Sequence, residues 1–134
     1  MLIAQANTKT YPILMNENQR ETELLLKSVS AIGRAHKLSA KELSRITGIE
    51  AGDLVRTDGE EGRYILTANQ TQAAQEMLRL YKELTAFFGE DNSEASRWLH
   101  TRNLDFDARP IDILNTTGGI KRVCQYLRDY RSRS

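Results

Sequence analysis

The side chains that could carry out chemistry are few in this sequence and stand far apart. Its two histidines, His36 and His100, have no companion at the spacing of metal ligands, so we interpret each as a helix-end residue that contacts terminal carbonyls. Cys124 is the only cysteine and falls on the apolar side of a predicted helix, where it is best explained as a small core side chain. We therefore predict no metal site and no thiol nucleophile.

The remaining polar motifs are equally poor in catalytic potential. Asp105 and Asp107 flank a phenylalanine, but the central Gly and terminal Glu of a calcium loop are missing. Gly118-Gly119 could open a helix that holds an anion at its N-terminus, although close helix packing is the favoured explanation. Because no nucleophile, base and orienting residue form a set, we predict a protein that is not an enzyme and needs no cofactor.

The elements that would position these residues are helices. Apolar residues recur every three to four positions along most of the 134 residues, and no strand-like alternation competes with them, so the fold class is predicted to be all-α. We divide the chain into a flexible arm at 1–19, a helix-turn-helix domain with a long connecting helix at 20–89, and a small helical domain at 90–134. The first helix is expected from Arg20 to about His36.

Local signals fix several details of these helices. A Ser or Thr followed three residues later by Glu or Gln is a capping box, and Ser93 is expected to cap a short helix. The predicted capping boxes are Ser39 with Glu42 and Thr67 with Gln70, and the predicted inward residues of the second short helix are Leu54 and Val55.

Charge is distributed unevenly although the formal net charge is only +1. Residues 109–134 hold six Lys or Arg against two Asp, whereas residues 39–66 hold four against six Asp or Glu. This separation suggests two faces with different partners, the plainer explanation being solvated helix surfaces. No apolar run is long enough for a membrane span and no basic-then-apolar leader opens the chain, so we expect a cytoplasmic protein without membrane contact.

Two short helices joined at Gly48 have the form of a helix-turn-helix. The start of the second helix carries Glu50 and Asp53, which would repel phosphates, so base readout is predicted to be poor while backbone contacts are conceivable. A purely structural corner is the competing interpretation. The candidate DNA-binding residues are Lys41, Arg45, Glu50, Asp53 and Arg56.

The segment "ASRWLHTRNLDFDARPIDILNTTGGIKRVCQYL" resembles the toxin-binding domain of the MbcA/ParS/Xre antitoxin family. The matching features are Ala95, Trp98-Leu99, the loop to Leu104, Pro110 to Leu114, and Gly118 with the closing helix Val123 to Leu127. The resemblance implies an antitoxin that binds a RES-domain toxin, an NAD-using protein similar to ADP-ribosyltransferases. The predicted helix-turn-helix would add autoregulation of the operon through operator DNA, with the chain acting as a homodimer or within a toxin–antitoxin complex.

The toxin is expected to contact the outward loop and helix faces of this segment, since its apolar residues are needed for packing. One hypothesis is that the basic "RDYRSRS" follows the last helix as an inserted tail, with the Ser134 carboxylate imitating an anion. The candidate toxin-binding residues are Arg102, Asn103, Asp105, Arg109, Asp112, Arg128, Tyr130, Arg131, Arg133 and Ser134.

Two other functions remain open from the sequence. The chain could be a stand-alone Xre-type transcriptional regulator whose C-terminal domain only dimerises. A small-molecule-binding or enzymatic helical domain ranks last, because no polar cluster converges on one point.

Overall fold

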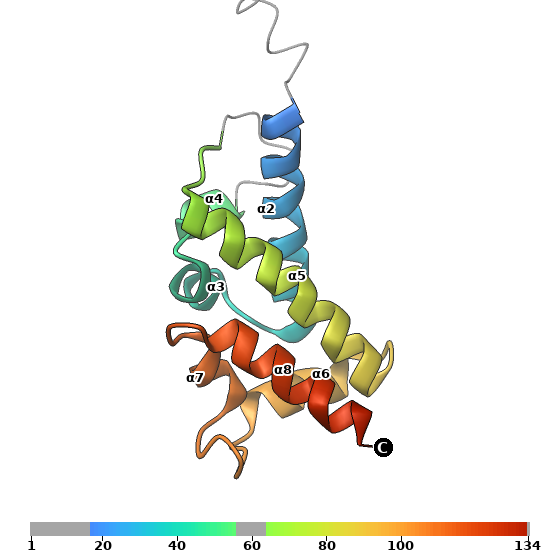
Figure 1. Ribbon diagram of the computed structural model, residues 1–134. Helices are drawn as coiled ribbons and strands as arrows, with labels where there is room; N and C mark the ends of the chain where they lie inside the picture. The colour runs from blue at the N-terminus through green and yellow to red at the C-terminus, as the bar shows by residue number, and fades with distance from the viewer. Residues whose placement is uncertain (1–16, 56–63, 134) are drawn as a thin grey trace, which may run out of the picture.

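The computed structural model describes residues 17–55 and 64–133, and within these residues the chain forms helices and no strand (Figure 1). The all-α prediction is confirmed. The helices are α2 (Glu17–His36), α3 (Ala40–Thr47), α4 (Ala51–Val55), α5 (Ala68–Phe88), α6 (Asn92–His100), α7 (Pro110–Leu114) and α8 (Gly119–Ser132). None of the helices in the described ranges is long and apolar enough to cross a membrane.

Helix α2 begins three residues earlier than expected, at Glu17 instead of Arg20, and ends at His36 as predicted. The end of the predicted arm at 1–19 is therefore helical, and its residues 1–16 lie outside the described part of the chain. The α2–α3 turn is tight, because Lys37 takes a positive φ of 61° and Leu38 N–H donates to the Gly33 carbonyl at 2.8 Å.

The corner between α3 and α4 forms as its sequence predicts. Ser39 and Glu42 make the reciprocal capping box, and Gly48 ends α3 in the left-handed region with φ 79°, a conformation that favours glycine. Leu54 is buried, but the prediction for Val55 is wrong, since its side chain is 65% exposed. In a helix of five residues, the neighbour of a buried side chain points 100° away from it and here reaches solvent.

The caps of the later helices are a mixture of confirmed and corrected predictions. Thr67 and Gln70 form the second capping box, and Gln70 Nε2 also donates to the Gly48 carbonyl at 2.7 Å, which ties α5 to the α3–α4 corner. Helix α6 is capped by Asp91, whose carboxylate accepts from Ser93 N–H at 3.0 Å, and not by Ser93 itself.

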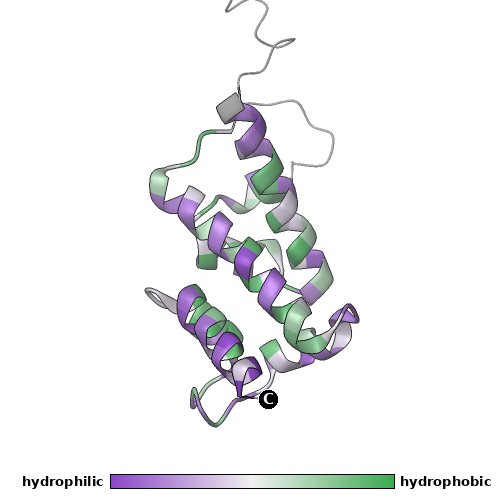
Figure 2. Cartoon of the chain, turned by 45° about the vertical axis from the view of Figure 1, so that its right-hand side comes forward, coloured by the Kyte–Doolittle hydropathy of each residue, from purple (hydrophilic) through white to green (hydrophobic). Residues whose placement is uncertain are grey.

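Helix α5 lies at the centre of the fold, with α2 against one side and α8 against another (Figure 1). Apolar residues of all three helices face one another, as the hydropathy colouring of Figure 2 shows. Lys121 meets Glu76 at 3.6 Å and, two turns further along both helices, Arg128 meets Glu83 at 3.2 Å, so α5 and α8 run parallel. The fully buried large side chains of the core are Leu26, Val29, His36, Ile49, Met77, Leu80, Leu84, Leu99, Leu114, Val123 and Leu127.

His36 is the one polar member of that fully buried set. Its side chain is 1% exposed, packs against the ring of Tyr81, and leaves both ring nitrogens without a hydrogen-bond partner. The expected contact with helix-end carbonyls is therefore wrong for His36, whereas it is confirmed for His100, whose Nδ1 lies 2.8 Å from the Ser96 carbonyl. Burial, with the charge of His100 as a lesser cause, lowers the pKa of His36 below its usual 6.5.

This burial makes stability depend on pH in a predictable direction. Because the folded chain disfavours protonated His36, the unfolded chain binds more protons below pH 6.5, and the free energy of unfolding falls as the pH drops through that range. The His36→Phe variant is expected to lose this pH dependence and to be more stable than the wild type at about pH 5.5. For a single titrating group, the free energy of unfolding can change by at most about 1.4 kcal/mol per pH unit. Urea unfolding of the variant and the wild type at about pH 7.5 and pH 5.5 measures it.

His100→Gln is the matched control, since it removes a histidine that is hydrogen-bonded and only partly buried. The His100→Gln variant should keep most of the pH dependence of the free energy of unfolding. Equal slopes for His36→Phe and the wild type would show that the buried imidazole is not the group responsible.

Candidate functional site

The loop between α6 and α7, residues 101–109, is fixed by its own contacts. Asn103 and Ala108 form an antiparallel bridge, with hydrogen bonds of 2.8 and 3.4 Å in the two directions. Inside it, the Asn103 side-chain oxygen accepts from Asp105 N–H at 2.8 Å, and Arg102 is paired with Asp107. Leu104 lies in the turn of this loop and is 86% exposed, so a large apolar side chain is held in solvent by an ordered backbone.

Aromatic side chains attach the loop to α8. The Tyr126 hydroxyl donates to Asp105 Oδ2 at 2.6 Å, and its ring lies 4.7 Å from that of Phe106 and 6.1 Å from that of Trp98. Burial and the hydrogen bond to Asp105 raise the pKa of Tyr126 to about 12, so the hydroxyl stays a donor at physiological pH. Tyr130 continues the row, with its ring 5.2 Å from that of Tyr126.

Two arginines flank this row on the same side of α8. Arg122, Tyr126, Tyr130 and Arg133 are spaced by three or four residues and therefore share one side of the helix. The Arg122 guanidinium lies 5.3 Å from the Phe106 ring centre, and that of Arg133 lies 5.9 Å from the Tyr130 ring centre. We call the resulting surface the aromatic face, defined as Leu104, Arg122, Tyr126, Tyr130 and Arg133, with the buried ring of Phe106 beneath it.

The candidate toxin-binding residues do not form one patch. Tyr130 and Arg133 lie on the aromatic face, and Arg102, Asn103 and Asp105 belong to the loop beside it. The other members are elsewhere or outside the described residues: Arg109 and Asp112 at α7, Arg128 and Arg131 on the side of α8 that faces α5, and Ser134 outside the described part.

The expectation that "RDYRSRS" follows the last helix needs correction. Helix α8 continues to Ser132, so Arg128 to Ser132 are helical. Arg128 and Arg131 both pair with Glu83 of α5 at 3.2 Å, which places them in the α5–α8 contact and not in a tail.

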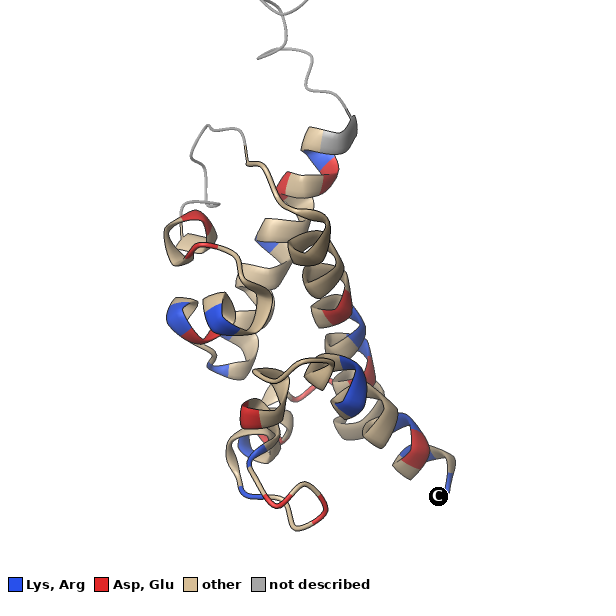
Figure 3. Ribbon diagram, turned by 60° about the vertical axis from the view of Figure 1, so that its left-hand side comes forward, with Lys and Arg blue, Asp and Glu red and all other residues tan. Residues whose placement is uncertain are grey.

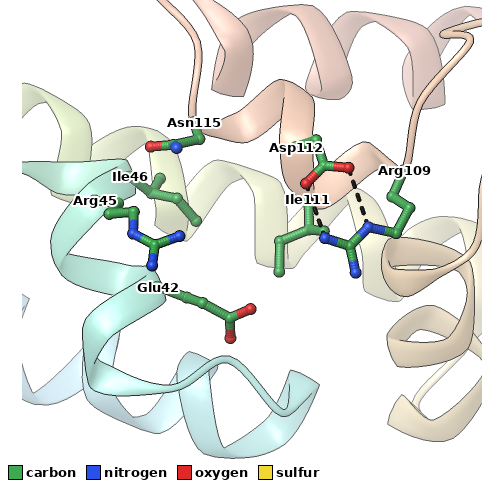
Figure 4. Close-up of a pocket in the computed structure, with 7 residues that line it drawn as sticks. All are labelled: Glu42, Arg45, Ile46, Arg109, Ile111, Asp112 and Asn115. Carbon is green, nitrogen blue, oxygen red and sulfur yellow. Dashed lines mark hydrogen bonds and ion pairs between the residues drawn. The ribbon is translucent and has the colours of Figure 1, made fainter.

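Arg109 and Asp112 line a small cleft between α3 and α7 (Figure 4). They form a two-pronged ion pair, with Arg109 Nε donating to Asp112 Oδ2 at 3.0 Å and Nη2 donating to Oδ1 at 2.9 Å. The hydrogen bonds from Arg109 hold the pKa of Asp112 below its usual value. Arg45 and Glu42 reach into the same cleft from α3, so a candidate DNA-binding residue and two candidate toxin-binding residues share one hollow.

The candidate DNA-binding residues lie at the α3–α4 corner, apart from Arg56, which is outside the described residues. Lys41 and Arg45 are exposed on α3. Glu50 directly precedes α4 and Asp53 is in its first turn, so the start of the second helix is acidic as expected.

Packing accounts for both Gly119 and Cys124. A Cβ on Gly119 would lie 1.7 Å from the Ile113 carbonyl oxygen, so close packing explains this glycine, as expected. Cys124 is buried, and burial raises the pKa of its thiol to about 11. Among residues 17–55 and 64–133, no three His, Cys, Asp or Glu side chains are grouped as metal ligands.

The comparison with protein families matches the region that holds the aromatic face. Residues 83–133 match the antitoxin Xre/MbcA/ParS C-terminal toxin-binding domain. This part of the chain belongs to that family. The toxin-binding domain thus begins inside α5, includes α6 to α8, and contains every residue of the aromatic face. Its presence supports an antitoxin of the Xre/MbcA/ParS type with a toxin as its partner. No curated protein matches the sequence.

Sequence reasoning missed the centre of the aromatic face within this toxin-binding domain. The sequence indicates Leu104 only as the end of a loop, and it predicts no binding role for Phe106, Arg122 or Tyr126. The spacing of Arg122, Tyr126, Tyr130 and Arg133 on one side of a helix was a usable signal, because Arg and Tyr are enriched where proteins bind proteins.

Proposed function

We propose that this chain is the antitoxin of a type II toxin–antitoxin system and neutralises a RES-domain toxin by binding it directly through the aromatic face. The observation that carries the proposal is Leu104, an exposed leucine on a loop whose backbone is already ordered. A rigid apolar anchor loses little conformational entropy on binding, and the neighbouring Tyr and Arg side chains are those that dominate interface energies.

Binding at this face accounts for inhibition by blocking an active site. A toxin that uses NAD must bind its pyrophosphate, so its cleft offers cationic groups or N–H donors. Asp105 and Asp107 both follow Leu104 in the loop and are exposed, so the loop presents an apolar tip with acidic neighbours to such a cleft. Insertion of the loop would exclude NAD without any chemistry by the antitoxin.

The second part of the proposal is that the antitoxin regulates its own operon in the cytoplasm by binding operator DNA. The α3–α4 corner with Gly48 supports a helix-turn-helix. A homodimer would place two such units on paired half-sites and gain affinity through avidity, which compensates for poor base readout.

A stand-alone Xre-type regulator is the alternative function, and the aromatic face also supports the dimerisation that this function requires. Exposed apolar and aromatic side chains can bury against a second copy as well as against a toxin. A RES-domain gene beside the gene of this chain favours the antitoxin, and its absence favours the regulator.

Co-expression with the neighbouring RES-domain protein tests the antitoxin function. Cells that make the RES-domain protein alone should stop growing and lose NAD, and cells that also make this chain should grow normally. The two proteins should co-purify. Arrested growth despite abundant, folded antitoxin would contradict the proposal.

A further inference from the structure

We infer that the groove between α5 and α8 is a phosphate-binding surface for duplex DNA. This inference rests on the proposed operator binding and identifies the surface that contacts the DNA backbone. The groove is lined by Glu76, Arg79, Lys121, Cys124, Gln125 and Arg128. Figure 3 shows Lys and Arg along α5 and α8, apart from those of α3.

Ion pairs in this groove keep the positive charge outermost. Glu76 pairs with Lys121, and Glu83 pairs with both Arg128 and Arg131. The two carboxylate side chains are only 12% and 16% exposed, whereas those of the three cations are 63%, 47% and 42% exposed. An approaching anion therefore meets the cations first.

Arg79 adds a cation that is not neutralised. It lines the groove from α5 and has no ion pair with any residue in the described ranges. Its guanidinium can therefore bind a phosphate oxygen without giving up an existing contact.

The groove is a better phosphate site than the helix-turn-helix. In the described residues, the α3–α4 corner has two cations, Lys41 and Arg45, against the three carboxylates of Glu42, Glu50 and Asp53. The groove and its rim have four cations, Arg79, Lys121, Arg128 and Arg131, against the two mostly buried carboxylates of Glu76 and Glu83 and the exposed carboxylate of Asp129, which accepts from Gln125. Since phosphate contacts supply most of the affinity of non-specific DNA binding, the groove should contribute more of it.

The chemistry of the groove favours DNA over an acidic protein. Protein interfaces need an apolar or aromatic anchor, and the only apolar side chain lining the groove is that of buried Cys124. Protein–DNA interfaces are more polar and more positive. Lys121 and Arg128 are separated by two turns, about 10 Å along α8, so they could contact separate phosphates of one strand.

The position of the groove also allows both partners to bind together. Lys121, Gln125 and Arg128 lie on the side of α8 opposite Tyr126 and Tyr130, because each residue turns the helix by 100°. A toxin on the aromatic face would leave the groove open. The complex, and not only the free antitoxin, is then expected to bind the operator.

Fluorescence anisotropy with a labelled duplex from the region upstream of the gene tests this inference. The variant replaces Arg79, Lys121 and Arg128 by Gln, and the control replaces Arg20, Lys27 and Arg97 by Gln, which are cations of α2 and α6 outside the groove. Loss of three phosphate contacts should reduce the slope of log K against log salt by about 2.7, equivalent to roughly 100-fold weaker binding at about 0.15 M salt. Unchanged circular dichroism and a single cooperative urea transition confirm that the variant is folded.

The outcomes separate this inference from the proposed function. If the wild type binds the duplex and the groove variant binds it with the same affinity and slope, the groove is not the site. Loss of binding only on reversing Lys41 and Arg45 would equally overturn the inference in favour of the helix-turn-helix. Weaker toxin binding by the groove variant, with DNA binding unchanged, would identify an acidic protein surface as the occupant.

If the wild type binds no duplex, operator binding and the groove inference both fail. The toxin-neutralising part of the proposed function is judged separately, by growth rescue. Should the groove variant misfold, the single Arg79→Gln change is decisive, because Arg79 has no ion pair in the described residues, and about one unit of slope should be lost.

Discussion

Leu104→Asp is expected to abolish toxin binding while the antitoxin stays folded. The leucine is 86% exposed, so its replacement removes no packing from the free chain. Burying a leucine in an interface contributes about 1.5–3 kcal/mol, and a buried unpaired carboxylate adds a desolvation cost. Together these predict a toxin affinity at least about 100-fold weaker, measurable by calorimetric titration and by loss of growth rescue.

Leu24→Asp is the matched control for this variant. Leu24 of α2 is also exposed, at 63%, but lies outside the toxin-binding domain. It should bind the toxin as the wild type does. Normal toxin binding by Leu104→Asp would remove the aromatic face from the proposed mechanism, and equal losses in both variants would indicate damage to the fold.

The second large effect concerns stability. Gly119→Ala is expected to destabilise the protein by about 3 kcal/mol or more, at the upper end of the cost of overpacking. The new methyl group would lie 1.7 Å from the Ile113 carbonyl oxygen and 2.7 Å from its carbon, and these backbone atoms can move only if the α7–α8 corner opens. Urea unfolding gives the free-energy change.

Gly118→Ala provides the comparison at the adjacent position. Gly118 has a positive φ of 71° but no atom within 4 Å of the added Cβ, so only conformational strain of about 1–2 kcal/mol is expected. If both alanine variants unfold at the same urea concentration, steric contact with Ile113 is not what requires a glycine at 119.

Features governed by neighbours in sequence were predictable. The capping boxes at Ser39 and Thr67, the turn at Gly48 and the position of Pro110 at the start of α7 depend on side chains within a few residues, and each is observed. The errors in these local predictions shift a helix boundary or a cap by a few residues. Asp91 displaced Ser93 as the cap, because a carboxylate two residues upstream can accept the same kind of backbone hydrogen bond.

The candidate site could not be predicted as well, because it depends on contacts between distant segments. Exposure of Leu104 follows from the Asn103–Ala108 bridge and from the bond between Tyr126 and Asp105, and neither is encoded in a local pattern. The same applies to "RDYRSRS". Two of its arginines, Arg128 and Arg131, pair with Glu83 of α5, a partner 45 residues away from Arg128.

Helix α5 has a consequence for the chain as a whole. Its buried residues Ala74, Met77, Leu80 and Leu84 serve the interior shared with α2 and the interior shared with α8. A protease cut between Phe88 and Asn92 would therefore leave neither fragment with a complete interior. Degradation from either end is therefore expected to proceed in a single cooperative step. A cell should contain either the intact antitoxin or none of it, and no half-length product that still binds the toxin.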